Sequence, residues 1–355
     1  MTTAPGLTDA AAVSGVAVAP VDLTGRTGLW PRPELRLWRA AMARALAEVD
    51  PSMRAPLGGD RMLREQLARH TGAPVDRTVV VAGIRAAAAA VVRPATRVVL
   101  ERPTFLGVAR VLAAAGVEVG TEPWERLADA PAGSAVWFTT PARNPDGRTA
   151  DAAVFDAVGR LATGGRTVVC NTAYEWFGPA PPDLPGVVRV ATLHKLAGPG
   201  ACLGWVSGDA LTPDTVMELS LAAPPLHWQR AWGHFLAVGG LALLRERYAH
   251  LPAARCAFLD GVAAPGPLGM GPHVLLPVTC QERAAVDALA AAGVLVSPGS
   301  AFAAPGPSIR VSLAGLTVPQ VRTAAATVAA VLGTHLSTGL RQPAPAASGA
   351  GATPG

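Results

Sequence analysis

Short apolar runs rich in valine alternate with alanine-rich segments across the middle of the chain. The runs occupy residues 78–81, 97–100, 117–119, 135–138, 167–170, 187–191 and 203–207. Apolar strands separated by helices are typical of a largely parallel sheet with helices packed on both faces. Such sheets bind ligands at the carboxyl ends of their strands. The pattern therefore predicts an α/β fold and directs attention to the residues that follow each run.

Helical periodicity precedes and follows this region. Pro33 begins a segment with one apolar face, and a second helix is expected near Asp60. A helical stretch is expected over 226–249. Beyond it the pattern predicts strands at 274–278, 294–296 and 309–313, a helix near 282–292 and a last helix capped by Thr317. The mixed C-terminal pattern predicts a smaller α+β domain beside the sheet.

The length of 355 residues accommodates both units. The two ends are rich in small residues and proline, without apolar periodicity. We expect a flexible N-terminal tail (1–20), an N-terminal segment and helix that contribute to the small domain (21–50), a large ligand-binding domain (51–249), a small C-terminal domain (250–335) and a disordered tail (336–355).

Composition excludes several classes of protein. Half of the residues are hydrophobic and 15% are charged, which is typical of a folded globular chain. No apolar stretch is long enough to span a membrane and no secretory signal is recognisable, so we expect a cytoplasmic protein without membrane contact. The four cysteines are scattered, which predicts neither disulfides nor a metal site. The net charge of +5 is dispersed, which argues against nucleic acid as a partner.

The basic residues carry a more specific signal. Lys195 is the only lysine among 30 lysines and arginines. Arginine can replace lysine wherever a solvated positive charge suffices, but guanidinium stays charged and cannot supply a neutral amine. Lys195 is therefore a candidate nucleophile, and the alternative is a stray surface lysine.

Polar residues follow four of the expected strands. Gly83-Ile84-Arg85 follow the first run and open a helix, where backbone N–H groups suit a phosphate, although an ordinary turn has the same pattern. Asn144 lies in the loop after residue 138. Asn171 and Tyr174 follow residue 170, and Thr192 precedes Lys195 by three positions.

These motifs, in this order, resemble the class I and II aminotransferases, which are pyridoxal-phosphate (PLP) enzymes of fold type I. The resemblance extends from about residue 22 to 335 and is greatest to the aminotransferase-like domain of MocR-type regulators, without their DNA-binding arm. It implies an aspartate-aminotransferase-like fold, a mainly parallel sheet sandwiched by helices with a smaller α+β C-terminal domain. PLP is the cofactor that the resemblance implies.

The resemblance also implies roles for individual residues. Lys195 would form the internal aldimine with PLP, and Thr192 with Gly83, Ile84 and Arg85 would bind the phosphate. Phe105 would stack on the pyridine ring, while Asn144 and Tyr174 would bond its 3-hydroxyl. Arg310 would bind the substrate carboxylate, unless it is a surface charge. Lys195, Tyr174 and Asn171 are the expected catalytic residues.

Two positions depart from the family pattern. Asn171 stands where the family has an aspartate that keeps the pyridine nitrogen protonated. Cys202 stands near the place of an arginine that binds the phosphate, and Arg85 and Arg54 are candidates to replace that arginine. We expect weaker electron withdrawal by the ring and weaker phosphate binding.

The resulting expectation is an aminotransferase of specialised metabolism that acts on an amino acid and a keto acid as a homodimer. Because of Asn171, two alternatives remain. One is another PLP reaction of an amino acid, such as decarboxylation, elimination or rearrangement. The other is a degenerate, non-catalytic sensor or partner protein with the same fold.

Overall fold

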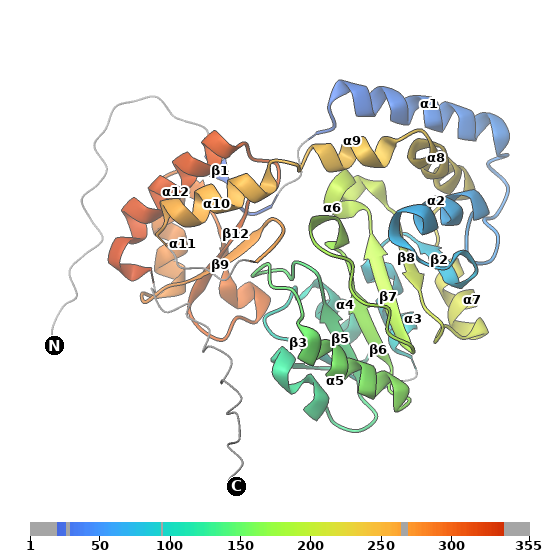
Figure 1. Cartoon of the computed structure of the whole chain (residues 1–355), viewed down its shortest axis with the longest axis horizontal. Coiled ribbons are helices and arrows are strands. Elements are labelled where there is room, and N and C mark those ends of the chain that lie inside the picture. The colour runs from blue at the N-terminus through green and yellow to red at the C-terminus, as the bar shows by residue number, and fades with distance from the viewer. Residues whose placement is uncertain (1–19, 26–28, 94, 264–268, 337–355) are drawn as a thin grey trace, which may run out of the picture.

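The computed structural model of the chain describes residues 20–25, 29–93, 95–263 and 269–336. The two expected tails, 1–20 and 336–355, lie almost wholly outside these residues. The described part forms two lobes, and the larger one contains the long sheet (Figure 1).

The large lobe is built on a seven-stranded sheet in the order β2-β8-β7-β6-β5-β3-β4. The five strands from β7 to β4 are parallel, and β8 runs antiparallel to both of its neighbours. The mainly parallel sheet predicted from the sequence is confirmed. Its strands are β2 (Thr78–Val81), β3 (Arg97–Glu101), β4 (Glu118–Glu122), β5 (Ala135–Thr139), β6 (Val168–Asn171), β7 (Val187–Thr192) and β8 (Gly204–Ser207).

Helices cover both faces of this sheet, as the doubly apolar strands require. Within β3, Val98 and Leu100 belong to one core cluster, and Val99 between them belongs to a cluster on the opposite face. The flanking helices are α2 (Arg61–Thr71), α3 (Ile84–Val92), α4 (Gly107–Ala114), α5 (Ala152–Thr163), α6 (His194–Ala197), α7 (Pro213–Leu221) and α8 (Leu226–Ala237). Short 3-10 turns lie at Val75–Arg77, Trp124–Asp129, Glu175–Phe177, Pro199–Ala201, Gly299–Phe302 and Gly333–His335.

The small lobe contains an antiparallel sheet in the order β11-β12-β9. Its strands are β9 (His273–Pro277), β11 (Ser297–Pro298) and β12 (Ser308–Ser312), and its helices are α10 (Leu251–Gly261), α11 (Glu282–Ala291) and α12 (Val318–Leu332). Thr317 begins α12 in a capping box with Gln320, so the predicted cap is confirmed. Two helices, α7 and α10, were not predicted.

The N-terminal segment divides between the lobes. β1 (Val21–Asp22) pairs with β10 (Val294–Leu295) of the small lobe. In contrast, α1 (Arg32–Glu48) packs on α8 of the large lobe, where Trp38 contacts Trp232 with ring centroids 4.5 Å apart. The expected helix over 226–249 is two helices, because Gly239 (φ 86°) separates α8 from α9 (Gly240–Glu246).

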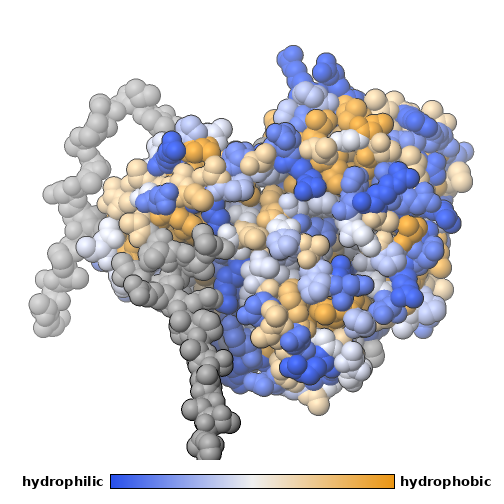
Figure 2. Space-filling model, in the orientation of Figure 1, coloured by the Kyte–Doolittle hydropathy of each residue, from blue (hydrophilic) through white to orange (hydrophobic). Residues whose placement is uncertain are grey.

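The surface shows several separate hydrophobic groups among hydrophilic residues on the face in Figure 2. Within the part of the chain that the structure describes, no helix is long and apolar enough to cross a membrane.

Candidate active site

A cavity of about 1440 Å³ lies at the carboxyl ends of the central strands. Thr139, Asn171 and Thr192, the last residues of β5, β6 and β7, line it. Pro272 and His273 close it from the small lobe. The cavity therefore lies at the edge of the sheet where the sequence pattern predicts a ligand site.

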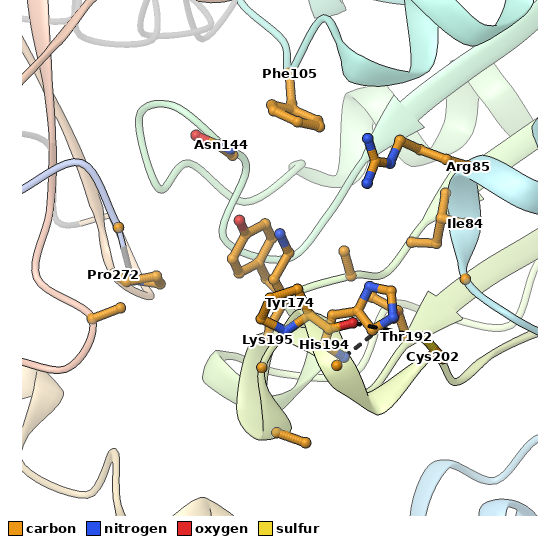
Figure 3. A pocket seen from close by; sticks show the side chains of 18 of the residues that line it. Ile84, Arg85, Phe105, Asn144, Tyr174, Thr192, His194, Lys195, Cys202 and Pro272 are labelled. Carbon is orange, nitrogen blue, oxygen red and sulfur yellow. Dashed lines mark hydrogen bonds between the residues drawn. The ribbon is translucent and has the colours of Figure 1, made fainter. Parts of the chain in front are cut away.

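Lys195 projects into this cavity from the four-residue helix α6, just after β7 (Figure 3). Its Nζ lies 5.0 Å from the centroid of the Tyr174 ring and 6.0 Å from that of Phe105. Phe105 is 46% exposed and lies on the opposite side of the cavity from Lys195. An amine and an aromatic ring thus face each other across a space that a planar ligand can enter.

The start of α3 forms a concave part of the wall. Gly83 precedes the helix with φ 148°, a conformation open essentially to glycine, and a Cβ there would lie 2.8 Å from Cε1 of His194. No side chain of the described residues caps α3. The first turn of α3 contains Ile84 and Arg85, and its backbone N–H groups are therefore suited to binding an anion.

Asn171 is held by two hydrogen bonds. Its Oδ1 accepts the N–H of Ala173 at 3.1 Å, and its Nδ2 donates to Oγ1 of Thr139 at 3.3 Å. If the amide were reversed, Nδ2 of Asn171 would face the N–H of Ala173, and two donors would meet. The orientation of the amide is therefore fixed. Asn171 presents a neutral amide to the cavity.

Asn144 lies in the loop after β5, next to a buried arginine. Arg143 is 1% exposed, pairs with Asp146 and stacks 3.9 Å above the ring of Trp124. Asn144 is itself buried, and among the described residues its Oδ1 has no hydrogen-bond partner. A buried acceptor or donor of this kind normally finds a partner, which supports a ligand at this point.

Thr192 and Arg310 are engaged with the protein in this structure. Thr192 donates from Oγ1 to the carbonyl of Leu203 at 2.9 Å and accepts the N–H of His194 at 3.2 Å. Arg310 does not line the cavity; its Nη1 donates to the carbonyl of Thr24 at 3.1 Å and its guanidinium lies 4.6 Å from the Phe302 ring centroid. Their expected roles stay predictions.

The candidates for phosphate binding are placed differently. Arg85 and the exposed Cys202 both line the cavity, and Cys202 has φ 43°. Arg54 lies in the exposed loop between α1 and α2 and does not line the cavity of its own chain. Arg85 is therefore the candidate that lies close to Gly83, at the start of α3.

Two histidines of the site were not predicted from the sequence. Burial lowers the pKa of His194 to about 4, with contributions from the charges of Lys195 and Arg85. Burial likewise lowers the pKa of His273, whose Nε2 lies 2.8 Å from Oη of Tyr174. His194 is the immediate neighbour of Lys195, which was an available signal. Nothing in the sequence around His273 points to this contact.

Fold and cavity together define a fold-type I, aspartate-aminotransferase-like architecture. A model of the family "Aminotransferase class I and II" matches residues 29–199. No curated protein sequence matches the chain.

Solved structures of aminotransferases are similar over most of the chain. The aspartate aminotransferase of Thermus thermophilus with maleate has a TM-score of 0.74 at 24% identity, covering 89% of this chain and 92% of that one. N-succinyldiaminopimelate aminotransferase from Mycobacterium tuberculosis has a TM-score of 0.71 at 20% identity, with 88% and 93% covered. The multiple substrate aminotransferase from Thermococcus profundus has a TM-score of 0.71 at 19% identity, with 88% and 91% covered. These findings show that the chain has the fold of these aminotransferases and that residues 29–199 are similar to the class I and II aminotransferase family.

A buried carboxyl lies next to Thr139, which lines the cavity. Glu101, at the end of β3, is 0% exposed, and its Oε1 accepts a hydrogen bond from Thr104 at 3.1 Å. Burial raises the pKa of Glu101 to about 7, although Thr139 and the charge of Arg143 oppose this. The side chain is therefore protonated in mildly acidic solution.

Glu101 is expected to make the folded state less stable as the pH rises. Because the pKa is raised from 4.5 to about 7 on folding, its contribution is fully present below pH 4.5 and is lost as the pH rises through 7. Urea unfolding of the native protein and Glu101→Gln at pH 5 and pH 8 should show the native protein losing about 2 kcal/mol relative to the variant. A difference that does not change with pH would contradict the raised pKa.

Proposed function

We propose that the chain is a PLP-dependent enzyme that acts on an amino acid, and that its reaction is transamination. The observation that carries this proposal is the amine of Lys195 inside a cavity that also contains an uncapped helix start. The Cβ-free position at Gly83 before α3 and the buried amide of Asn144, which lines the cavity, support a fit to PLP. When bound, PLP would supply an electron-accepting ring conjugated to the α-carbon of the amino acid.

Each end of the cavity has residues suited to one part of the cofactor. The first turn of α3 and Arg85 would bind the phosphate. Phe105 would cover one face of the ring, and Asn144 and Tyr174 would donate to its 3-oxygen. Asn171 would contact the ring nitrogen.

Lys195 has two tasks in this proposal. Its unprotonated amine would hold the cofactor through the aldehyde carbon, with loss of water, and once displaced by the substrate amine it would carry the proton at the substrate Cα. Arg310 would pair with the carboxylate of the amino acid and of the keto acid, which requires its guanidinium to turn from the Thr24 carbonyl toward the cavity.

Asn171 favours a second candidate, another PLP reaction or a non-catalytic sensor. A neutral amide does not stabilise a positive charge on the ring nitrogen, so the ring withdraws electrons less strongly. The exposed cysteine at position 202 likewise supplies no cation for the phosphate.

We propose that the protein works in biosynthesis or other specialised metabolism, in the cytoplasm, and as a homodimer.

The first prediction concerns the covalent attachment of PLP. Purified protein with PLP should develop a visible absorption band that disappears with borohydride, and mass spectrometry should then find the adduct on Lys195. Lys195→Arg keeps the positive charge but cannot form the bond, so it should show neither band nor adduct. An adduct absent from Lys195 in the native protein would refute the proposed function.

The second prediction concerns the phosphate. Arg85→Gln should weaken PLP binding about tenfold, because a charge-assisted hydrogen bond is lost, and should leave pyridoxal binding unchanged. Fluorescence titration of both compounds measures the difference. Arg54→Gln is the matched control within one chain, and an equal loss in that variant would point to contact with a partner subunit. If Arg85→Gln binds PLP normally, Arg85 does not replace the missing arginine.

The third prediction concerns the reaction. Asn171→Asp should accelerate the spectral change caused by the amino acid that the native protein accepts best, by at least tenfold, because a carboxylate stabilises the protonated ring. Stopped-flow absorption measures this rate. An equal or slower rate would show that the site is adapted to chemistry with a neutral ring and would favour the second candidate.

A further inference from the structure

A buried hydrogen bond joins the two lobes beside Lys195. Nε2 of His273, the first residue of β9, lies 2.8 Å from Oη of Tyr174, which follows β6. His273 and Tyr174 are 5% and 4% exposed, and their rings meet edge to face at 83°. Both side chains line the cavity. Neither the sequence motifs nor the proposed function assigns a role to His273.

The surroundings of His273 keep its ring neutral. Burial lowers its pKa well below the ordinary value of 6.5, and the positive charges of Arg310, Lys195 and Arg255 act in the same direction. These charges come from different elements: Arg310 from β12, Lys195 from α6 and Arg255 from α10. Arg255 also donates to the backbone carbonyl of His273, which fixes the start of β9.

The surroundings of Nδ1 determine which nitrogen of the neutral His273 ring carries the single proton. Nδ1 of His273 is buried and has no hydrogen-bond partner among the described residues. A buried N–H without a partner is rare in proteins, whereas an acceptor without one is tolerated more often. The proton therefore resides on Nε2, and His273 donates it to Oη of Tyr174.

This direction determines what Tyr174 can do. Its oxygen accepts from His273, so its own proton is not used in that bond and can be donated into the cavity. The centroid of the Tyr174 ring lies 5.0 Å from Nζ of Lys195, and both residues line the cavity.

We propose that His273 is a positioning residue that holds the Tyr174 hydroxyl as a donor toward the 3-oxygen of the cofactor. The inference rests on the proposed function. His273 belongs to the small lobe and Tyr174 to the large lobe. The orientation of the Tyr174 hydroxyl therefore also depends on how the two lobes contact each other.

The test measures the pKa at which the visible band of the PLP-loaded protein titrates. A donor to the 3-oxygen withdraws electron density and weakens the hold of the chromophore on its proton. His273→Phe should therefore raise this pKa by about one unit, a tenfold change in proton affinity. His273→Gln, which keeps an N–H donor, should restore most of the native value.

A double-mutant cycle separates positioning from general disturbance. Tyr174→Phe should raise the same pKa at least as far as His273→Phe does, and combining the two changes should add nothing further. His250→Gln is the matched control, since Nε2 of His250 lies 2.7 Å from the Leu316 carbonyl, and it should leave the pKa unchanged. Additive effects, or a His273→Phe pKa within 0.2 units of native while Tyr174→Phe shifts it, would overturn the inference.

A direct measurement covers the case in which His273→Phe does not fold. In ¹⁵N-histidine-labelled native protein loaded with PLP, the resonance assigned through His273→Gln should report a neutral ring with a bare Nδ1 at pH 7. A proton on Nδ1, or a charged ring, would overturn the inference. Failure of the native protein to bind PLP covalently is a separate result, which refutes the proposed function instead.

Discussion

The site depends on the parallel pairing of β5, β6 and β7. Register places Thr139 opposite Asn171 and Asn171 opposite Val190, so the strands deliver their last side chains to one edge of the sheet. Lys195 comes three residues after Thr192, the last residue of β7, and is the second residue of α6. A shift of one residue in any pair would turn an inward side chain to the other face. Backbone hydrogen bonding, more than any single side-chain contact, therefore brings an amine, an amide and a hydroxyl together.

Sequence reasoning succeeded where local pattern and chemistry coincide. The strands were found because buried parallel strands are apolar on both faces, and the polar residues after them were found because ligands bind at that edge. Lys195, Asn171 and Tyr174 line the cavity as this logic requires, and so does Phe105, which only the resemblance singled out. The cap at Thr317 was equally local, since the capping box lies within four consecutive positions.

The remaining features depend on contacts between distant segments. α1 was expected to contribute to the small domain, yet its Trp38 packs on α8. Tertiary packing of the amphipathic face determines where such a helix lies. His273 meets Tyr174 across 99 positions of sequence, and no spacing rule connects them. Arg310 was expected to bind the substrate carboxylate, and in this structure the Thr24 carbonyl and the Phe302 ring engage it. Such partners become visible only when the chain is folded.

The two departures from the family pattern have opposite electrical effects at opposite ends of the proposed cofactor. In the proposed function, Asn171 would remove a negative charge at the ring nitrogen and Cys202 would remove a positive charge at the phosphate, so the two changes together would leave the net charge of the cavity the same. The kind of interaction would change at the ring nitrogen, where an amide hydrogen bond would replace an ion pair, while the start of α3 and the exposed Arg85 would bind the phosphate. Hydrogen bonds to a neutral ring are weaker and more directional than an ion pair. Correct positioning of the neighbouring donors, Tyr174 and Asn144 among them, then carries more of the chemistry than charge does.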